Sequence, residues 1–221
     1  MRSPYERKLV KTHVIRKGED IAEVVARYSE GLALPGDVIA VSESVVAISQ
    51  GRAIPEDGIR VGLLARVLWR FVTQVPYGVG LRSRATMQCA INECGAFRIL
   101  VAALVSAFTK LFGRKGYFYR IAGAQAALID AAHTSPVEPY ASCVILGPRD
   151  PDSVAEEIKK RTGVDAAIMD INDIGGSWVI GKTSGFDPAV LEEIMRDNPM
   201  GQGNELTPIC VVKDLAAPGG F

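Results

Sequence analysis

Acidic and amide side chains follow two apolar stretches of the chain that have the composition of buried strands. Asp170 and Asn172 come after the first stretch, and Asp130 comes directly after Leu128-Ile129. Ligands of α/β proteins gather at the carboxyl ends of strands, and Mg²⁺ and Mn²⁺ prefer oxygen ligands. These residues are therefore candidates for a site that holds a cation and a phosphate. An aspartate after a strand is also a common turn or cap residue, so each position alone is a weak signal.

Glycines flank one further candidate. Gln202 lies between Gly201 and Gly203, and glycines let a backbone approach a ligand closely. Gly181-Lys182-Thr183 resembles the end of a phosphate loop, and we predict a solvated loop there. The dinucleotide motif GxGxxG is absent. The residues indicate an anion or metal site without identifying the ligand.

The elements that position these residues alternate between helices and short strands, which predicts an α/β fold with a mixed α+β sheet. Spacing and capping residues predict helices over 18–28, over 153–162 with a stop at Gly163, and from Asp187-Pro188 onward. Asp150 or Asp152 is expected to cap the second of these helices. The stretch 66–111 is predicted to be largely helical, with a break near 76–78. Apolar runs predict strands at Val38–Ser49, Ser142–Leu146, Ala166–Ile171, Ser177–Ile180 and Ile209–Val212.

Charge is distributed unevenly, although 25 basic and 25 acidic residues cancel, a balance that argues against a dedicated nucleic-acid binder. From Ile59 to Ile129 ten basic residues accompany one acid, Glu93, so this segment carries +9 and the remainder −9. Such a segment attracts phosphates and carboxylates, or it pairs with the acidic remainder within the fold or across a dimer. The basic residues are Arg60, Arg66, Arg70, Arg82, Arg84, Arg98, Lys110, Arg114, Lys115 and Arg120.

The segment Leu63–Val72 allows a third interpretation, because Arg66 and Arg70 alternate with apolar residues there. A helix of this kind lies on a membrane surface, although a core-facing amphipathic helix has the same spacing. No apolar run approaches the ~20 residues of a spanning helix, and the N-terminal stretch is charged, unlike a signal peptide. We expect a soluble, cytoplasmic protein with one domain over 1–221, in which 55–127 forms a helical subdomain.

The cysteines and histidines are scattered. Four cysteines without a CxxC pair, and two histidines far apart in sequence, do not have the spacing of a structural zinc site. Without a secretory signal, such cysteines are typical of reduced thiols in a protein core.

Five segments, in order along the chain, resemble the γ-glutamyl ligase family of the deazaflavin coenzyme F-420. The resemblance covers both ends of the chain and leaves Pro55–Ala127 unmatched. It implies a homodimer with the α/β fold of that family, in which the central segment is more helical and more basic. It also implies a ligase that uses GTP and Mg²⁺ or Mn²⁺ to join L-glutamate to the deazaflavin precursor, or to a related carboxylate acceptor, through an amide bond. The segments are GEDIAEVV, PGDVIAVSESVVAISQGR, IDAAHTSP, DPDSVAEEIKKRTG followed by a strand and Asp170-x-Asn172, and MGQGNELTPICVV.

The resemblance also assigns roles to residues. It implies metal ligands at Asp130, Asp170 and Gln202, with Asn172 fixing the loop that presents Asp170. We expect nucleotide or substrate contacts at Ser42, Ser44, Asn172, Gly201 and Gly203.

Three departures from the family pattern leave alternatives open. Ile48 stands where the family usually has a lysine, no basic residue lies between Asp170 and Lys182 where arginines are usual, and Gln202 is neutral. Fewer cations weaken the stabilisation of phosphate charge. The alternatives are a non-catalytic or regulatory protein that binds a phosphorylated anionic ligand on the same scaffold, a peripheral membrane or interaction protein, and a metal-dependent hydrolase.

Overall fold

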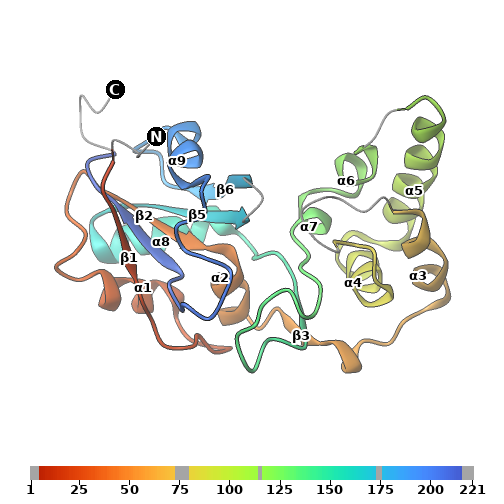
Figure 1. The fold of residues 1–221 in the computed structure, drawn as a ribbon, viewed down its shortest axis with the longest axis horizontal. Coiled ribbons are helices and arrows are strands. Elements are labelled where there is room, and N and C mark those ends of the chain that lie inside the picture. Colours follow the sequence, from red (N-terminus) through yellow and green to blue (C-terminus); the bar gives the residue numbers. More distant parts are fainter. Residues whose placement is uncertain (1–4, 73–79, 114–115, 173–175, 216–221) are drawn as a thin grey trace. The chain divides into compact units, whose positions relative to one another are not determined.

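The computed structural model describes residues 5–72, 80–113, 116–172 and 176–215. The chain folds as two compact units (Figure 1). Unit 1 contains both ends of the chain, residues 1–51 and 148–221, and unit 2 contains the segment between them, residues 52–147. The predicted break near 76–78 lies outside the described residues.

Unit 1 is a five-stranded mixed sheet with helices packed on it, which confirms the predicted fold class. The strand order is β1-β7-β2-β5-β6; β2 and β5 run parallel, and the other neighbours run antiparallel. The strands are β1 (Arg7–Val10), β2 (Val38–Ser42), β5 (Asp165–Asn172), β6 (Gly176–Lys182) and β7 (Ile209–Val212). The helices are α1 (Ile21–Ser29), α2 (Glu43–Ser49), α8 (Pro151–Thr162) and α9 (Pro188–Met195).

Helices cover both faces of the central strands. Val38, Ala40 and Met169 belong to one buried cluster with Leu191 and Met195 of α9. Helix α8 packs on β5 and β6, and α1 packs against α8. Because side chains alternate across a strand, two covered faces require a continuous apolar run. The sequences VIAV in β2 and AAIM in β5 meet this requirement, and all eight residues are fully buried.

Two helix ends in unit 1, at Gly163 and Asp187, confirm the sequence prediction, whereas the first helix starts later than predicted. Asp20 accepts hydrogen bonds from two backbone N–H groups in the first turn of α1, so this helix begins at Ile21 rather than at residue 18. Gly163 ends α8 with a φ of +73°, a conformation that favours glycine. Asp187 caps α9 by accepting a hydrogen bond from Ala189 N.

Two predicted segments are wrong. The strand predicted over Val38–Ser49 stops at Ser42 and continues as helix α2, because a short apolar run does not distinguish a buried strand from a buried helix. Gly181-Lys182 lies in β6 rather than in a solvated loop, and Thr183 is buried. The Thr183 hydroxyl donates to Asp165 Oδ1 at 2.5 Å.

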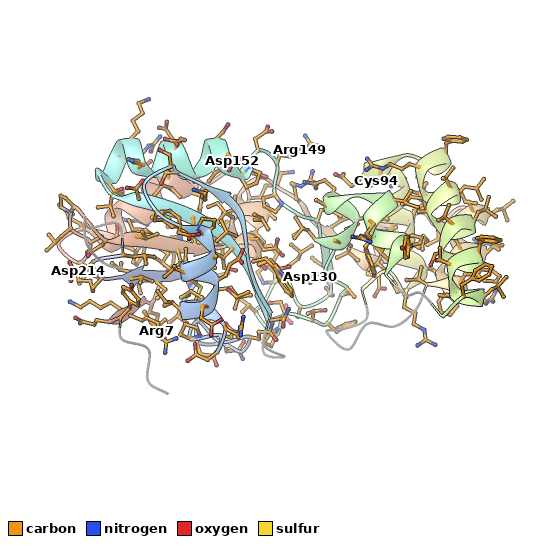
Figure 2. The ribbon with its side chains drawn as sticks, turned by 90° about the horizontal axis from the view of Figure 1, so that it is seen from above. Arg7, Cys94, Asp130, Arg149, Asp152 and Asp214 are labelled. Carbon is orange, nitrogen blue, oxygen red and sulfur yellow. The ribbon has the colours of Figure 1, made fainter. Side chains whose placement is uncertain are left out.

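The predicted cap of α8 is also wrong. Asp150 occupies the cap position with a φ of +45°, but its side chain makes no capping hydrogen bond. Asp152, in the first turn of α8 (Figure 2), instead accepts a hydrogen bond from Lys182 N at 2.9 Å. Pro151 at the first helical position starts the helix, since its fixed φ suits that position, and Asp152 ties the helix to β6.

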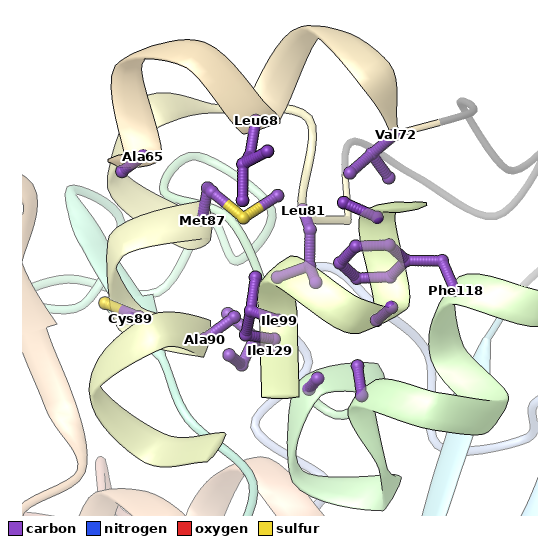
Figure 3. Close-up of a cluster of buried hydrophobic side chains, with 14 of the residues drawn as sticks. Ala65, Leu68, Val72, Leu81, Met87, Cys89, Ala90, Ile99, Phe118 and Ile129 are labelled. Carbon is purple, nitrogen blue, oxygen red and sulfur yellow. The ribbon is translucent and has the colours of Figure 1, made fainter. Parts of the chain in front are cut away.

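Unit 2 is mainly helical and has a two-stranded antiparallel sheet of β3 (Ala53–Pro55) and β4 (Cys143–Ile145). Its core gathers side chains from most of its helices (Figure 3). The helical prediction for 66–111 is confirmed for the described residues, although the first helix starts earlier, at Leu63. The helices are α3 (Leu63–Leu68), α4 (Arg84–Cys94), α5 (Ala96–Leu111), α6 (Tyr117–Ala122) and α7 (Ala124–Ala127), with 3₁₀ turns η1 (Glu56–Gly58) and η2 (Trp69–Phe71).

Arg52 joins the two ends of unit 2. Its side chain is buried, Nε donates to Gly147 O at 2.5 Å, and Nη2 forms an ion pair with Glu93 at 2.6 Å. The only acid of the basic segment is therefore neutralised by an arginine that lies outside that segment.

In unit 1, Gln50 forms hydrogen bonds with the backbone of Arg149 through both of its amide atoms, at 2.9 and 2.7 Å. It thereby holds together the two chain segments that lead to unit 2.

The four cysteines are free thiols. Burial raises the pKa of Cys89 to about 11 and that of Cys210 to about 12. Cys143 is buried as well, and Cys94 is half-buried. The prediction of reduced core thiols is confirmed for the three buried residues.

Asp37 is a buried carboxylate directly before β2. Burial by itself raises its pKa, but Lys213 Nζ at 2.5 Å and the backbone N–H groups of Asp214 and Leu34 outweigh burial, so the pKa lies below its ordinary value. The ionised carboxylate therefore stabilises unit 1.

Asp37→Asn should lower the free energy of unfolding at pH 7 by about 1–3 kcal/mol, because Lys213 loses its buried partner. The stabilisation is present above the unfolded pKa of about 3.9 and is lost as pH falls through the lower folded pKa. Urea unfolding between pH 2.5 and 7 should therefore show the variant and wild type converging in acid. Asp214→Asn, an exposed carboxylate beside it, serves as the control. An equal loss at every pH would contradict this account.

Candidate functional site

The carboxyl ends of β2 and β5 meet at one edge of the sheet in unit 1. Their parallel register pairs Ser42 with Met169, so Asp170 is the next residue along β5. The segment before β7 reaches the same edge, because Ser42 N donates to Pro208 O at 2.9 Å. Three parts of the chain that are far apart in sequence are thereby brought together.

Asp170 is a half-buried carboxylate in this edge, opposite Trp178 of β6. Among the described residues, none donates a hydrogen bond to the Asp170 carboxylate or forms an ion pair with it. Burial raises its pKa above the ordinary value, and nothing offsets that effect. A carboxylate removed from water without a partner is unfavourable, so a bound cation would stabilise it.

Asn172 holds the connection between β5 and β6. Gly176 N donates to Asn172 Oδ1 at 3.1 Å, and a Cβ at Gly176 would overlap both Asn172 and the Trp178 ring. The side-chain oxygen of Asn172 thus holds Gly176, the first residue of β6, beside the end of β5.

The loop that carries Gln202 lies next to Asp170. Gln202 is exposed, and its Nε2 donates to Ile171 O at 3.4 Å. A Cβ at Gly201 or Gly203 would lie 2.9 or 2.8 Å from the Glu205 carboxyl group, so the two glycines make room for that side chain. Glu205 is an additional oxygen donor of this loop that the sequence did not predict, because only the fold turns it back over the glycines.

Helix α2 starts at the same edge. Ser42 is its cap residue but makes no side-chain capping hydrogen bond, and Ser44 is half-buried in the first turn. Glu43, between them, is only 6% exposed. Since α2 packs against β5, both Glu43 and Asp170 lie at the junction of these elements. The sequence did not predict a role for Glu43, because the strand predicted over Val38–Ser49 contains this residue and does not indicate its burial at the start of a helix.

Asp130 belongs to unit 2. It follows α7, and its backbone exchanges hydrogen bonds with Ile145, at 2.8 and 3.1 Å. Of the three predicted metal ligands, Asp170 and Gln202 are neighbours within unit 1, and Asp130 lies in the other unit.

Within the described part of the chain, no three His, Cys, Asp or Glu side chains converge tightly enough to hold a metal ion by themselves. The donor set nevertheless suits a hard cation: the desolvated carboxylate of Asp170 and the amide oxygen of Gln202. Mg²⁺ usually takes one or two carboxylates and completes its shell with water and substrate phosphates. These two donors therefore fit a divalent cation, which would need further ligands from water or a bound substrate.

Residues 176–183, GSWVIGKT, have the complete GxxxxGK[ST] spacing of a phosphate loop. That motif binds phosphate where it turns from a strand into a helix, whereas here it forms strand β6. Lys182 Nζ donates to the carbonyls of Thr183 and Phe186, at 3.1 and 3.2 Å. A Cβ at Gly181 would lie 2.5 Å from Pro151 Cβ, so this glycine allows close packing of α8. The structure thus excludes a phosphate loop at this position.

Oxygen donors at the carboxyl edge of a parallel strand pair are typical of ligand-binding α/β proteins. A family model described as F420-0:Gamma-glutamyl ligase matches residues 9–185, which is most of the chain. The protein belongs to this family, as the resemblance predicted. The match includes the central segment 55–127 that the resemblance left unmatched, and it ends before Gln202.

Asp170→Asn should raise the free energy of unfolding at pH 7 in the absence of metal by about 1–3 kcal/mol, because burial of a neutral amide is less unfavourable than burial of an ionised carboxylate. Because the folded pKa is raised, the wild type should gain stability relative to the variant as pH falls from 7 toward 4. Urea unfolding at both pH values measures this difference. Asp57→Asn, at an exposed carboxylate, is the matched control. A variant less stable than wild type at pH 7 would show that Asp170 already has a compensating partner.

Proposed function

We propose that this protein is a GTP-dependent γ-glutamyl ligase that joins L-glutamate to the deazaflavin precursor F420-0 or to a related carboxylate acceptor. Membership of the F420-0:gamma-glutamyl ligase family supports glutamate ligation. The main structural support in this chain is the environment of Asp170. Its carboxylate is desolvated at the carboxyl edge of the sheet and has no cationic partner among the described residues. Such a carboxylate would bind a divalent cation that accompanies nucleotide phosphates.

The reaction proceeds in two steps that balance without an outside oxidant or reductant. A carboxylate oxygen of the acceptor attacks the γ-phosphorus of GTP, which forms an acyl phosphate and releases GDP. The amine of L-glutamate then attacks the acyl carbon, phosphate leaves with the C–O electron pair, and the amine loses a proton as the amide forms. The protein positions the reactants and compensates their negative charge.

Each predicted residue has a place in this proposal. Asp170 and Gln202 would hold Mg²⁺ or Mn²⁺, which supplies charge neutralisation at the phosphates. The assignment of Asp130 as a metal ligand stays a prediction based on the resemblance, as does the homodimer. The residues proposed to contact nucleotide or substrate around the edge are Ser42, Ser44, Asn172, Gly201 and Gly203.

One observation favours a second function, namely binding of a phosphorylated ligand without catalysis. Ile48, at the position where the resemblance leads us to expect a lysine, is buried in α2. Lys182, the first basic residue after Asp170, is held by two backbone carbonyls. The edge of unit 1 therefore has fewer cations for phosphate than the family pattern implies, which would lower transition-state stabilisation more than binding.

Incubation with F420-0, L-glutamate, GTP and Mg²⁺ or Mn²⁺ should give a product heavier by one glutamate residue, together with GDP, as followed by mass spectrometry and nucleotide chromatography. Asp170→Asn should lower kcat/KM by about a hundredfold or more, while Asp57→Asn keeps the wild-type value. Saturable binding of GTP and F420-0 without GDP release would instead establish the binding protein. Full activity of Asp170→Asn would refute the role of this carboxylate.

Gln202→Glu should tighten the binding of Mn²⁺ roughly tenfold, because a charged oxygen replaces a neutral one, and Gln202→Ala should weaken it. Water-proton relaxation during Mn²⁺ titration measures the affinity, and Asn204→Asp, in the same exposed loop, controls for added charge. Equal affinities for all three Gln202 forms would remove Gln202 from the metal site.

A further inference from the structure

Helix α5 has two apolar faces, of which unit 2 buries only one. Ile99, Ala102, Ala103 and Ser106 are buried and belong to the inner face. The opposite face repeats apolar residues at helical spacing, and they are between 38% and 81% exposed. These exposed residues are Phe97, Leu100, Leu104, Phe108 and Leu111, followed by Phe112.

Helix α3 and the turn η2 extend this surface. Leu63, Val67 and Phe71 recur every four residues and are exposed by 51–80%. Helix α3 contacts helix α5 in unit 2, and Lys110 Nζ near the end of α5 donates to Phe71 O at 2.7 Å. Both helices are labelled in Figure 1. We call the nine residues the apolar face: Leu63, Val67, Phe71, Phe97, Leu100, Leu104, Phe108, Leu111 and Phe112.

This face gathers nine exposed large apolar side chains on neighbouring elements of unit 2. Single exposed apolar residues are normal, but a continuous group marks a surface that contacts something else. The ring centroids of Phe108 and Phe112 lie 5.1 Å apart, so the two rings are in contact near the C-terminal end of α5. The leucines and phenylalanines are the residue types that enter the acyl boundary of a bilayer.

Basic side chains accompany the apolar face and have no acidic partners in unit 2. Arg66 and Arg70 alternate with its residues on α3 and η2, and Arg98 and Lys110 lie on α5. None of these four, all exposed, forms an ion pair with an acid of the described part of unit 2. Glu93, the single acid of the segment, is held by Arg52 at 2.6 Å. Arg98 Nε and Lys110 Nζ also donate to backbone carbonyls, at 2.7 Å each, but a carbonyl carries no net charge and, unlike Lys182, all four side chains are exposed. Their positive charge can therefore attract an external anion.

We propose that the apolar face binds the surface of an anionic lipid bilayer, with its leucine and phenylalanine side chains among the acyl chains and its basic side chains at the headgroup phosphates. Apolar insertion and cationic attraction together give stable association where either alone is weak. A second copy of the chain is disfavoured as the occupant, because it would bring together two segments that each carry +9.

The helix would lie along the membrane rather than cross it. None of the described helices is by itself long and apolar enough to span a bilayer; α4 and α5 satisfy those criteria only as a pair that is bent by 118°. The inner face of α5 is part of the unit 2 core (Figure 3), so insertion can involve the outer face while the unit stays folded. This inference does not depend on the ligase activity.

Co-sedimentation of the full chain with vesicles tests the proposal. Vesicles of phosphatidylcholine with 30% phosphatidylglycerol should bind the protein at low salt, pure phosphatidylcholine should bind it at least about fivefold less, and added salt should release it. The variant Leu104→Glu/Phe108→Glu should partition at least about tenfold less. Leu34→Glu, at a similarly exposed leucine of unit 1, is the matched control and should bind like wild type.

Circular dichroism and size-exclusion chromatography with light scattering complete the test. Both variants should keep the wild-type helix signal, so that loss of binding is not loss of fold. Absence of binding to the anionic vesicles, or equal binding by the double variant, would overturn the proposal. A dimer that Leu104→Glu/Phe108→Glu dissociates, without vesicle binding by wild type, would overturn it in favour of a second copy as the occupant.

Discussion

The parallel pairing of β2 with β5 is the interaction on which the candidate site depends. A tight turn cannot join parallel strands, and here the connection contains all of unit 2 and helix α8. Both strands are buried on both faces, so a shift of one residue would turn Val41 or Ile168 away from its own side of the core. The register therefore holds Ser42 and Asp170 at one edge of the sheet independently of the sequence of unit 2.

Burial at that edge raises the pKa of the Asp170 carboxyl group. The carboxylate loses hydration and has no cationic partner among the described residues, while Asn172 fixes the backbone just beyond it. Lys182, a cation nearby in sequence, is held by carbonyl groups. Compensation for an ionised Asp170 would therefore come from outside this edge, as a bound metal ion would supply it. A ligase site needs such a cation for its phosphates as well.

The sequence predicts the parts of the fold that depend on local chemistry. The cap at Asp187 and the stop at Gly163 each involve residues one turn apart or less. Helix α2 was mistaken for a strand because its buried apolar run has no polar face to show a helical period. Asp170 could be selected because it follows the apolar residues of its strand, but its lack of a partner among the described residues depends on register. Glu205 could not be selected, since its carboxyl group lies beside Gly201 and Gly203 only when this loop is folded.

Titration of the Asp170 carboxyl group by carbon-13 NMR, in protein labelled at aspartate, tests the central claim most directly. The signal is assigned by its absence in Asp170→Asn and followed from pH 3 to pH 9, first without metal and then with saturating Mg²⁺ and GTP. We predict a pKa above the ordinary aspartate value without metal, and a clear fall when Mg²⁺ and GTP are bound, because the cation favours the charged form. An ordinary pKa that Mg²⁺ and GTP leave unchanged would contradict the account.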